Sequence, residues 1–186
     1  MMLDRKNESH VHDEVHARLM KLFLTEKRGC QIEVPFNYYG SRGFIDVLED
    51  LRPARNEVHL FELKPNLSQD IGEMIRQLKG YKEFYPKAAC DESATYLMFL
   101  VSYATDENIG IIEKYKELFI AAQIGIMLAG GDKRTDFPRL VCILTTDGKW
   151  LLEMVLQRER RKQEKRKKQE IRERESFKII RYKGYG

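Results

Sequence analysis

Two carboxylates and a lysine interrupt segments of the chain that otherwise have the composition of β-strands. Asp46 is the only charged residue in the apolar run 43–48, and Glu62 and Lys64 lie in the next run, 58–64. Because side chains alternate along a strand, Glu62 and Lys64 are expected on one face. Such charges are costly to bury without a cation, a partner or water, and paired carboxylates are ligands that Mg²⁺ or Mn²⁺ favours. We therefore predict a solvent-open metal site in which Lys64 faces a phosphate.

A hairpin and a helix are expected to position these residues. The polar turn 52–57 separates the two runs, which predicts that they pair as antiparallel strands. After the second strand, Ser68 is expected to cap a helix over about residues 69–84. Gln77 and Tyr81 are four residues apart in this helix and therefore share one face.

The ordered set of these residues resembles the PD-(D/E)xK nuclease superfamily. The set is Gly43-x-x-Asp46, then Glu62-x-Lys64, then Gln77-x-x-x-Tyr81, and the resemblance covers roughly residues 10–105. The Gln77-x-x-x-Tyr81 element is similar to that of the RecB-type branch. The hairpin motif, Gly43-x-x-Asp46 with Glu62-x-Lys64, is similar to that of archaeal Holliday-junction resolvases. Ile45 stands where the proline of the family name is expected. A lone Glu-x-Lys is a weak motif, whereas the ordered set is considerably more specific.

The resemblance implies a fold, a reaction and a role for each residue. The implied fold is a restriction-endonuclease-like mixed central β-sheet flanked by helices, and the implied reaction is hydrolysis of DNA phosphodiester bonds. Asp46 and Glu62 would hold Mg²⁺ or Mn²⁺, which polarises the phosphoryl oxygen and activates a water. Lys64 would orient that water and offset developing charge. Gln77 and Tyr81 would complete the catalytic set at the border of the nucleic-acid cleft; the alternative is ordinary packing.

The segment from about 7 to 24 has the apolar spacing of a helix, and two kinds of metal ligand occur in it. Members of the superfamily often carry a glutamate on this first helix that points at the metal, so Glu14 is a third candidate ligand; the alternative is a solvated helix charge. His12 and His16 are four residues apart and could share a zinc ion. Their order is not the His-Glu-x-x-His of zinc proteases, and no third ligand is evident.

The remaining pattern predicts a single α/β domain. Strands are expected at 31–35, 95–103, 124–128 and 140–144, with a helix at about 107–123 between the second and third of these. With the hairpin and the helix after it, this order predicts a mixed sheet flanked by helices. The predicted nuclease-like domain spans 1–149, and a charged C-terminal arm spans 150–186.

Composition restricts the class of protein. The chain has 186 residues, 42% of them hydrophobic and 33% charged, which suits one compact domain with a solvated appendage. It shows no signal peptide, and its longest apolar run is too short to cross a bilayer. We expect an intracellular protein without a membrane partner, in the cytoplasm or in a host cytoplasm if viral. Three scattered cysteines predict neither a disulfide framework nor a zinc knuckle.

The arm carries the basic excess of the chain. Residues 151–186 contain 13 Lys and Arg against 6 Asp and Glu, whereas the rest contains 20 against 23. A phosphate-binding helix is one interpretation; a solvated charged helix without a partner is another. Apolar residues at 150–156 could instead make a homodimer, and 177–182 reads as a strand. The candidate nucleic-acid contacts are Arg158, Arg160, Arg161, Lys162, Lys165, Arg166, Lys167 and Lys168.

Together these features predict a Mg²⁺- or Mn²⁺-dependent deoxyribonuclease that acts on DNA, with endonucleolytic cutting as the favoured mode. The alternative from another class is a catalytically inactive DNA-binding or assembly protein with the same fold, which would hold nucleic acid through the arm. A zinc hydrolase built on His12 and His16 is a third hypothesis.

Overall fold

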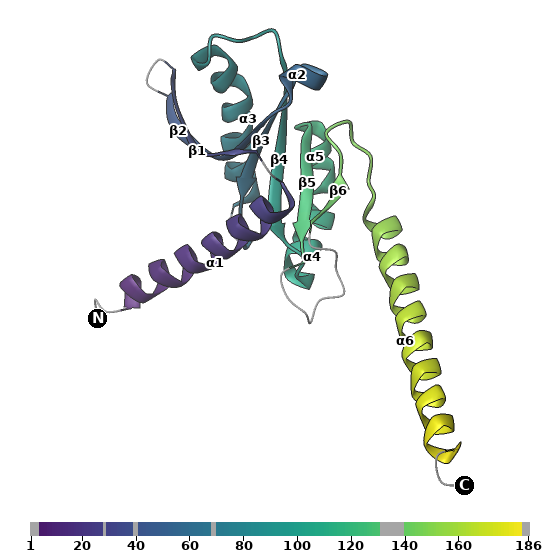
Figure 1. Ribbon diagram of the computed structural model, residues 1–186. Coiled ribbons are helices and arrows are strands. Elements are labelled where there is room, and N and C mark those ends of the chain that lie inside the picture. Colours follow the sequence, from purple (N-terminus) through teal and green to yellow (C-terminus); the bar gives the residue numbers. More distant parts are fainter. Residues whose placement is uncertain (1–3, 28, 39–40, 68–69, 131–139, 184–186) are drawn as a thin grey trace. The chain divides into compact units, whose positions relative to one another are not determined.

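The computed structural model divides the chain into two compact units, Met1–Leu151 and Leu152–Gly186 (Figure 1). The structure describes all residues except 1–3, 28, 39–40, 68–69, 131–139 and 184–186.

A six-stranded mixed sheet forms the centre of the first unit, with the strands side by side in the order in which they occur in the chain. The two central pairs, β3–β4 and β4–β5, are parallel, and the other three pairs are antiparallel. The predicted mixed α/β architecture and its central hairpin are confirmed. The strands are β1 (Gln31–Tyr38), β2 (Ser41–Asp50), β3 (Glu57–Leu63), β4 (Thr95–Tyr103), β5 (Ile124–Ala129) and β6 (Val141–Leu144).

Helices α1 (Asp4–Glu26) and α3 (Ile71–Ala88) cover opposite faces of the sheet around β3. Phe23 of α1 packs on Phe61, with ring centroids 4.7 Å apart. Gln77 of α3 approaches the next residue of the strand, Glu62. Since neighbouring residues of a strand point to opposite faces, β3 is covered by one helix on each side. The strand that carries Glu62 is therefore held between two packed layers.

Two crossovers make the parallel part of the sheet, and both differ in detail from the sequence prediction. Ser68, the predicted cap of the first crossover helix, lies outside the described residues; Asp70 caps α3 by accepting hydrogen bonds from the backbone N–H groups of Gly72 and Glu73. The predicted helix at 107–123 is broken at Tyr115, whose φ of −107° departs from helical geometry. It forms α4 (Asp106–Lys114) and α5 (Lys116–Ala121).

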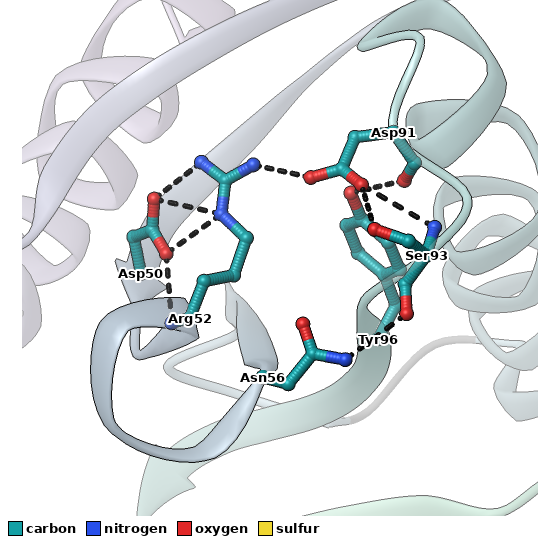
Figure 2. A network of polar contacts seen from close by, with 6 residues as sticks. All are labelled: Asp50, Arg52, Asn56, Asp91, Ser93 and Tyr96. Atoms are coloured by element: carbon teal, nitrogen blue, oxygen red, sulfur yellow. Dashed lines mark hydrogen bonds and ion pairs between the residues drawn. The ribbon is translucent and has the colours of Figure 1, made fainter.

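The predicted turn 52–57 contains a short helix, α2 (Arg52–Arg55), held by a polar network (Figure 2). The Arg52 guanidinium donates to both Asp50 and Asp91. Asn56, with the left-handed φ of 54° that ends α2, donates through Nδ2 to the Ser93 carbonyl at 3.1 Å. The network joins the β2–β3 connection to the loop before β4. It thereby fixes the start of β3, at the end of the strand remote from Glu62.

The second unit is one long charged helix, α6 (Leu152–Lys183). The sequence predicted a strand at 177–182, whereas the structure continues the helix through this segment. A helix that has already formed extends at little cost, and a lone strand without a paired edge gains no ladder hydrogen bonds. No helix among the described residues is long and apolar enough to cross a membrane.

Candidate active site

The site is organised by Asp46, where β2 stops pairing with β3. The β2–β3 ladder begins at Val47 opposite Phe61. One residue earlier, the Oδ2 atom of Asp46 accepts a hydrogen bond from the backbone N–H of Leu63 at 2.7 Å. The carboxylate thus replaces a ladder contact and is held beside the segment that contains Glu62 and Lys64. Its position follows from the backbone and does not depend on a flexible surface contact.

Glu62 is the most deeply buried charged group of the site, with only 3% of its side chain exposed. Its Oε1 atom lies 2.8 Å from the Lys64 ammonium and 3.4 Å from Nε2 of Gln77. Its Oε2 atom is buried without a hydrogen-bond partner. Burial and, after it, the neighbouring Asp46 charge raise the pKa of Glu62 to about 7, against the opposing effect of Lys64. A buried carboxylate oxygen without a partner is costly, so this one needs an explanation.

A hard divalent cation fits the donors that Asp46 and Glu62 present. Carboxylate oxygens are its preferred protein ligands, and the unpartnered Oε2 atom of Glu62 is such an oxygen, already desolvated. Within the described part of the chain, no three His, Cys, Asp or Glu side chains form a group that could hold a metal. Two carboxylates with water and a substrate oxygen are, however, a usual set for Mg²⁺. These two residues would hold the ion.

The raised pKa of Glu62 predicts how the stability of the metal-free protein depends on pH. The ordinary pKa is 4.5 and the folded value is about 7, so between these values the folded chain keeps a proton that the unfolded chain has lost. The free energy of unfolding must therefore fall as the pH rises through this window. In urea titrations with EDTA, the wild type should lose roughly 1–3 kcal/mol relative to Glu62→Gln between pH 5 and pH 8.

A carboxylate on the surface of α3 provides the control for that pH titration. Glu83 is exposed and pairs with Lys87 of the same helix. The variant Glu83→Gln should keep the pH dependence of the wild type. Parallel curves for the wild type and Glu62→Gln would show that Glu62 is not the titrating group.

Gln77 and Tyr81 line the α3 side of the site. The Gln77 side-chain amide donates to the Tyr81 hydroxyl as well as approaching Glu62. Burial and, after it, the charge of Glu62 raise the pKa of Tyr81 to about 12, so its hydroxyl remains protonated at neutral pH. The Tyr81 ring meets Phe36 edge to face, at 5.4 Å between centroids. The two residues therefore connect the Glu62 carboxylate to the packing of the β1–β2 hairpin.

Gly43 leaves the space that the Phe36 and Tyr81 rings occupy. A Cβ atom at this position would lie 2.7 Å from a ring carbon of Phe36 and 3.1 Å from one of Tyr81. Gly43→Ala must displace both rings, and we expect it to lower the free energy of unfolding by about 1–3 kcal/mol. Gly110→Ala is the control, because its Cβ would meet nothing within 4 Å; in helix α4 it should be neutral or stabilising. Equal stability of the two variants in urea would contradict this packing.

On α1 the residue that approaches Asp46 is His16, at 3.5 Å between Nε2 and Oδ2. This contact is the largest of the influences that raise the pKa of His16. Glu14, the predicted third metal ligand, is exposed and lies 4.0 Å from Arg18. The structure brings Asp46, Glu62, Lys64, Gln77 and Tyr81 together with His16 but leaves Glu14 outside this group. The side chain of His12 lies outside the described residues.

His16 was not predicted as a member of this site, although its position in the sequence indicates it. His16 precedes Leu19 by three residues and Phe23 by seven, and both are fully buried against the sheet. It therefore belongs to the stripe of α1 that faces the core. Glu14 is two residues away from His16, about 200° around the helix. The burial stripe, rather than the family analogy, gives the orientation of this helix.

Asn108 is a second residue that sequence reasoning did not find. It is almost fully buried, and its Nδ2 atom donates to the Pro65 carbonyl at 2.8 Å and to the Ser102 hydroxyl at 2.8 Å. Its Oδ1 atom accepts from the backbone N–H of Leu67 at 3.0 Å. These bonds fix the loop that directly follows Lys64. No local sequence pattern predicts these hydrogen bonds, because the partners of Asn108 in the loop are more than 40 residues away in sequence.

The eight candidate nucleic-acid contacts, from Arg158 to Lys168, all lie exposed on α6 in the second unit. They are distributed around the whole helix rather than along one face, since both Arg160 and Arg161 and all of 165–168 are basic. The arm therefore offers positive charge in every direction, which suits sequence-independent attraction to phosphates and gives no specific reading surface.

No family model and no curated protein matches this chain. Two solved structures are similar to it: an fdxN element excision controlling factor protein from Anabaena variabilis and an XisH family protein from Nostoc punctiforme PCC 73102. Each is 18% identical to this chain, with a TM-score of 0.46 over 63% of its length. The alignments cover 92% and 91% of those chains. A likeness of this degree does not establish a family.

Proposed function

We propose that this protein is a Mg²⁺- or Mn²⁺-dependent deoxyribonuclease with a restriction-endonuclease-like fold. The observation that carries the proposal is the Glu62 carboxylate, which is buried with an unpartnered oxygen beside Lys64. A protein gains nothing in stability from such a group, whereas a metal-dependent phosphodiesterase requires it. The Asp46 carboxylate, held against β3 at the same point, supplies the second acidic ligand.

Asp46 and Glu62 bind the cation, each prepared by a fixed contact. Asp46 is oriented by the Leu63 N–H, and Glu62 by Lys64 and Gln77. Donor groups that are already fixed need no reorganisation during the reaction. The ion, when bound, supplies polarisation of the phosphoryl oxygen and a bound water of lowered pKa.

Lys64 supplies the positive charge on the solvent side of the site. Its side chain is 38% exposed while its ammonium contacts Glu62, so it can reach both the buried carboxylate and a substrate. We assign to it the orientation of the attacking water and the stabilisation of the negative charge that develops on the phosphoryl oxygens. Gln77 and Tyr81 keep Glu62 in place, and His16 holds the outer side of Asp46.

The basic surface of α6 favours a second candidate function, a DNA-binding protein without catalysis. Its exposed lysines and arginines would neutralise phosphates whether or not the site is active. The two functions differ in their dependence on metal. Binding through α6 requires none, whereas cleavage requires Mg²⁺ or Mn²⁺ together with both carboxylates.

The test is an assay of the purified full chain on plasmid, linear duplex, single-stranded and branched DNA in Mg²⁺, Mn²⁺ or EDTA. We expect cleavage in at least one metal, none in EDTA, and none by Asp46→Asn or Glu62→Gln. Glu73→Gln, which removes an exposed carboxylate on α3, is the matched control and should cleave normally. Binding without cleavage of every substrate in both metals would replace this proposal with the DNA-binding function.

A further inference from the structure

One face of the β1–β2 hairpin packs on α3, and the opposite face is exposed. Gly43 and Phe36 are opposite each other in the hairpin and point toward Tyr81 of α3. The residues one position away must point to the other side of the hairpin. These are Pro35 and Asn37 of β1 and Arg42 and Phe44 of β2, paired as Pro35 with Phe44 and Asn37 with Arg42, and all four are exposed. We refer to these four residues as the outer hairpin face.

Phe44 is the notable member of the outer hairpin face, because 64% of this large aromatic side chain is exposed. The folded chain gains little from burial of this ring, so most of its apolar surface is available to a partner. Arg42 stands next to it on the same face, two residues along β2. An aromatic ring beside a cation is the combination that stacks a nucleobase and neutralises the adjoining phosphate.

The outer hairpin face leads directly to the candidate active site. Asp46 follows Phe44 by two residues, a distance of about 7 Å along a strand. At Asp46 the regular pairing is interrupted: Ile32 pairs with Val47 and Val34 with Ile45, while Glu33 between them adopts a φ of 49°. In Figure 1 the far end of this hairpin curves away from the other strands. Phe44 and Asp46 are therefore about one nucleotide apart along β2.

A cavity lies on the α1 side of Asp46. It has a volume of about 630 Å³ and is lined by His16, Met20 and Lys21 of α1 and by Glu33 of β1, among others. His16 also contacts Asp46, so the cavity adjoins the candidate active site. Met20 offers an apolar wall and Glu33 an acceptor for amino groups. The apolar wall and the carboxylate suit a base, and the Lys21 ammonium in the same lining suits the phosphate attached to it.

We propose that the outer hairpin face and this cavity bind single-stranded DNA, with a base stacked on Phe44 on one side of the scissile phosphate and a base in the cavity on the other. This inference rests on the proposed nuclease function and specifies its substrate as a strand with unpaired bases. In a duplex each base is stacked between its neighbours, so its face is closed to Phe44. The outer hairpin face and the cavity would thus bind single-stranded ends, flaps or gaps in preference to duplex DNA.

The first test is binding of a fluorescent single-stranded oligonucleotide to the full chain in EDTA, where no cleavage interferes. Phe44→Ala should weaken binding by about 5- to 100-fold, the loss of one base–aromatic stack, and Phe44→Trp should retain it. Arg42→Gln should reduce the salt slope by about 0.7. The controls are Leu118→Ala, an exposed apolar residue on α5, and Arg55→Gln on α2. Neither should change binding.

The second test localises the bound base even if α6 dominates the affinity. An oligonucleotide containing 5-iodouracil is irradiated with the protein, and the cross-linked peptide is identified by mass spectrometry. We expect an adduct at Phe44 with single-stranded but not duplex DNA. Adducts confined to Leu151–Gly186, or unchanged single-strand binding by Phe44→Ala, would overturn the inference. A second copy of this chain docked on Phe44 would also overturn it, and would appear as a dimer in sedimentation that Phe44→Ala abolishes.

The two proposals fail in different ways. If Phe44 binds single-stranded DNA but no substrate is cut in Mg²⁺ or Mn²⁺, the proposed single-strand binding site is supported and the proposed nuclease function is wrong. If cleavage depends on Asp46 but Phe44→Ala binds and cuts single strands normally, the nuclease function is supported and the proposed single-strand binding site is wrong.

Discussion

Replacing Lys64 with methionine is expected to reduce the rate of DNA cleavage by about 10²- to 10³-fold while the fold persists. The change removes the ammonium 2.8 Å from Glu62 but keeps the apolar stem, and loss of one preorganised donor to developing charge typically costs this much. The side chain is 38% exposed, so little packing is lost. The measurement is a single-turnover cleavage rate in saturating Mg²⁺.

The matched control for Lys64→Met is Lys149→Met. Lys149 is exposed and forms an ion pair with Asp147, in the turn after β6. Its rate should equal that of the wild type. If both methionine variants cut at the same rate as the wild type, Lys64 has no part in catalysis, and the assignment of its ammonium to the attacking water would be wrong.

Replacing Asn108 with alanine is expected to lower the free energy of unfolding by about 2–4 kcal/mol, the largest stability effect we predict. The side chain satisfies the Leu67 N–H and the Pro65 carbonyl, which are closed to solvent around it. Removing it leaves the Leu67 N–H without a partner, which costs about 1–3 kcal/mol, and removes one of the two hydrogen bonds to the Pro65 carbonyl, which contributes about 0.5–1.5 kcal/mol; the other, from the Ser102 hydroxyl, remains. Urea unfolding at constant pH measures the difference between this variant and the wild type.

The Asn108→Ala variant also tests how the loop after β3 supports the site. Pro65 follows Lys64 directly, so a loosened loop should reduce cleavage in addition to stability. The control is Asn66→Ala in the same loop, whose side chain is exposed; its stability should remain within about 0.5 kcal/mol of the wild type. Equal stabilities for Asn66→Ala and Asn108→Ala would show that the buried hydrogen bonds of Asn108 contribute nothing measurable.

The strands were predictable because their signal is local. The apolar run 95–103 matches β4 at both ends, and the alternation in 58–64 correctly separates Glu62 from Phe61. The hairpin was predictable from the polar turn between two such runs. What alternation does not show is that Asp46 ends the β2–β3 ladder with a side-chain contact to Leu63. That contact depends on the backbone geometry of two strands together.

The helices were predicted less well because tertiary packing decides their ends and orientation. The break at Tyr115 interrupts a segment whose composition favours one continuous helix. The side of α1 that faces the site depends on which of its apolar residues reach the sheet, and these proved to include Leu19 and Phe23. At the C-terminus, the β-branched pair Ile179-Ile180 suggested a strand. A strand without a partner is, however, less stable than the continuation of a helix that has already formed.

The most direct test of the central claim is calorimetric titration of the metal-free protein with Mn²⁺, comparing the wild type with Asp46→Asn and Glu62→Gln. If these two carboxylates hold the catalytic cation, the wild type should show one binding site that either substitution abolishes. Undiminished Mn²⁺ binding by both variants would contradict it, because the buried, unpartnered oxygen of Glu62 would then have no metal to bind.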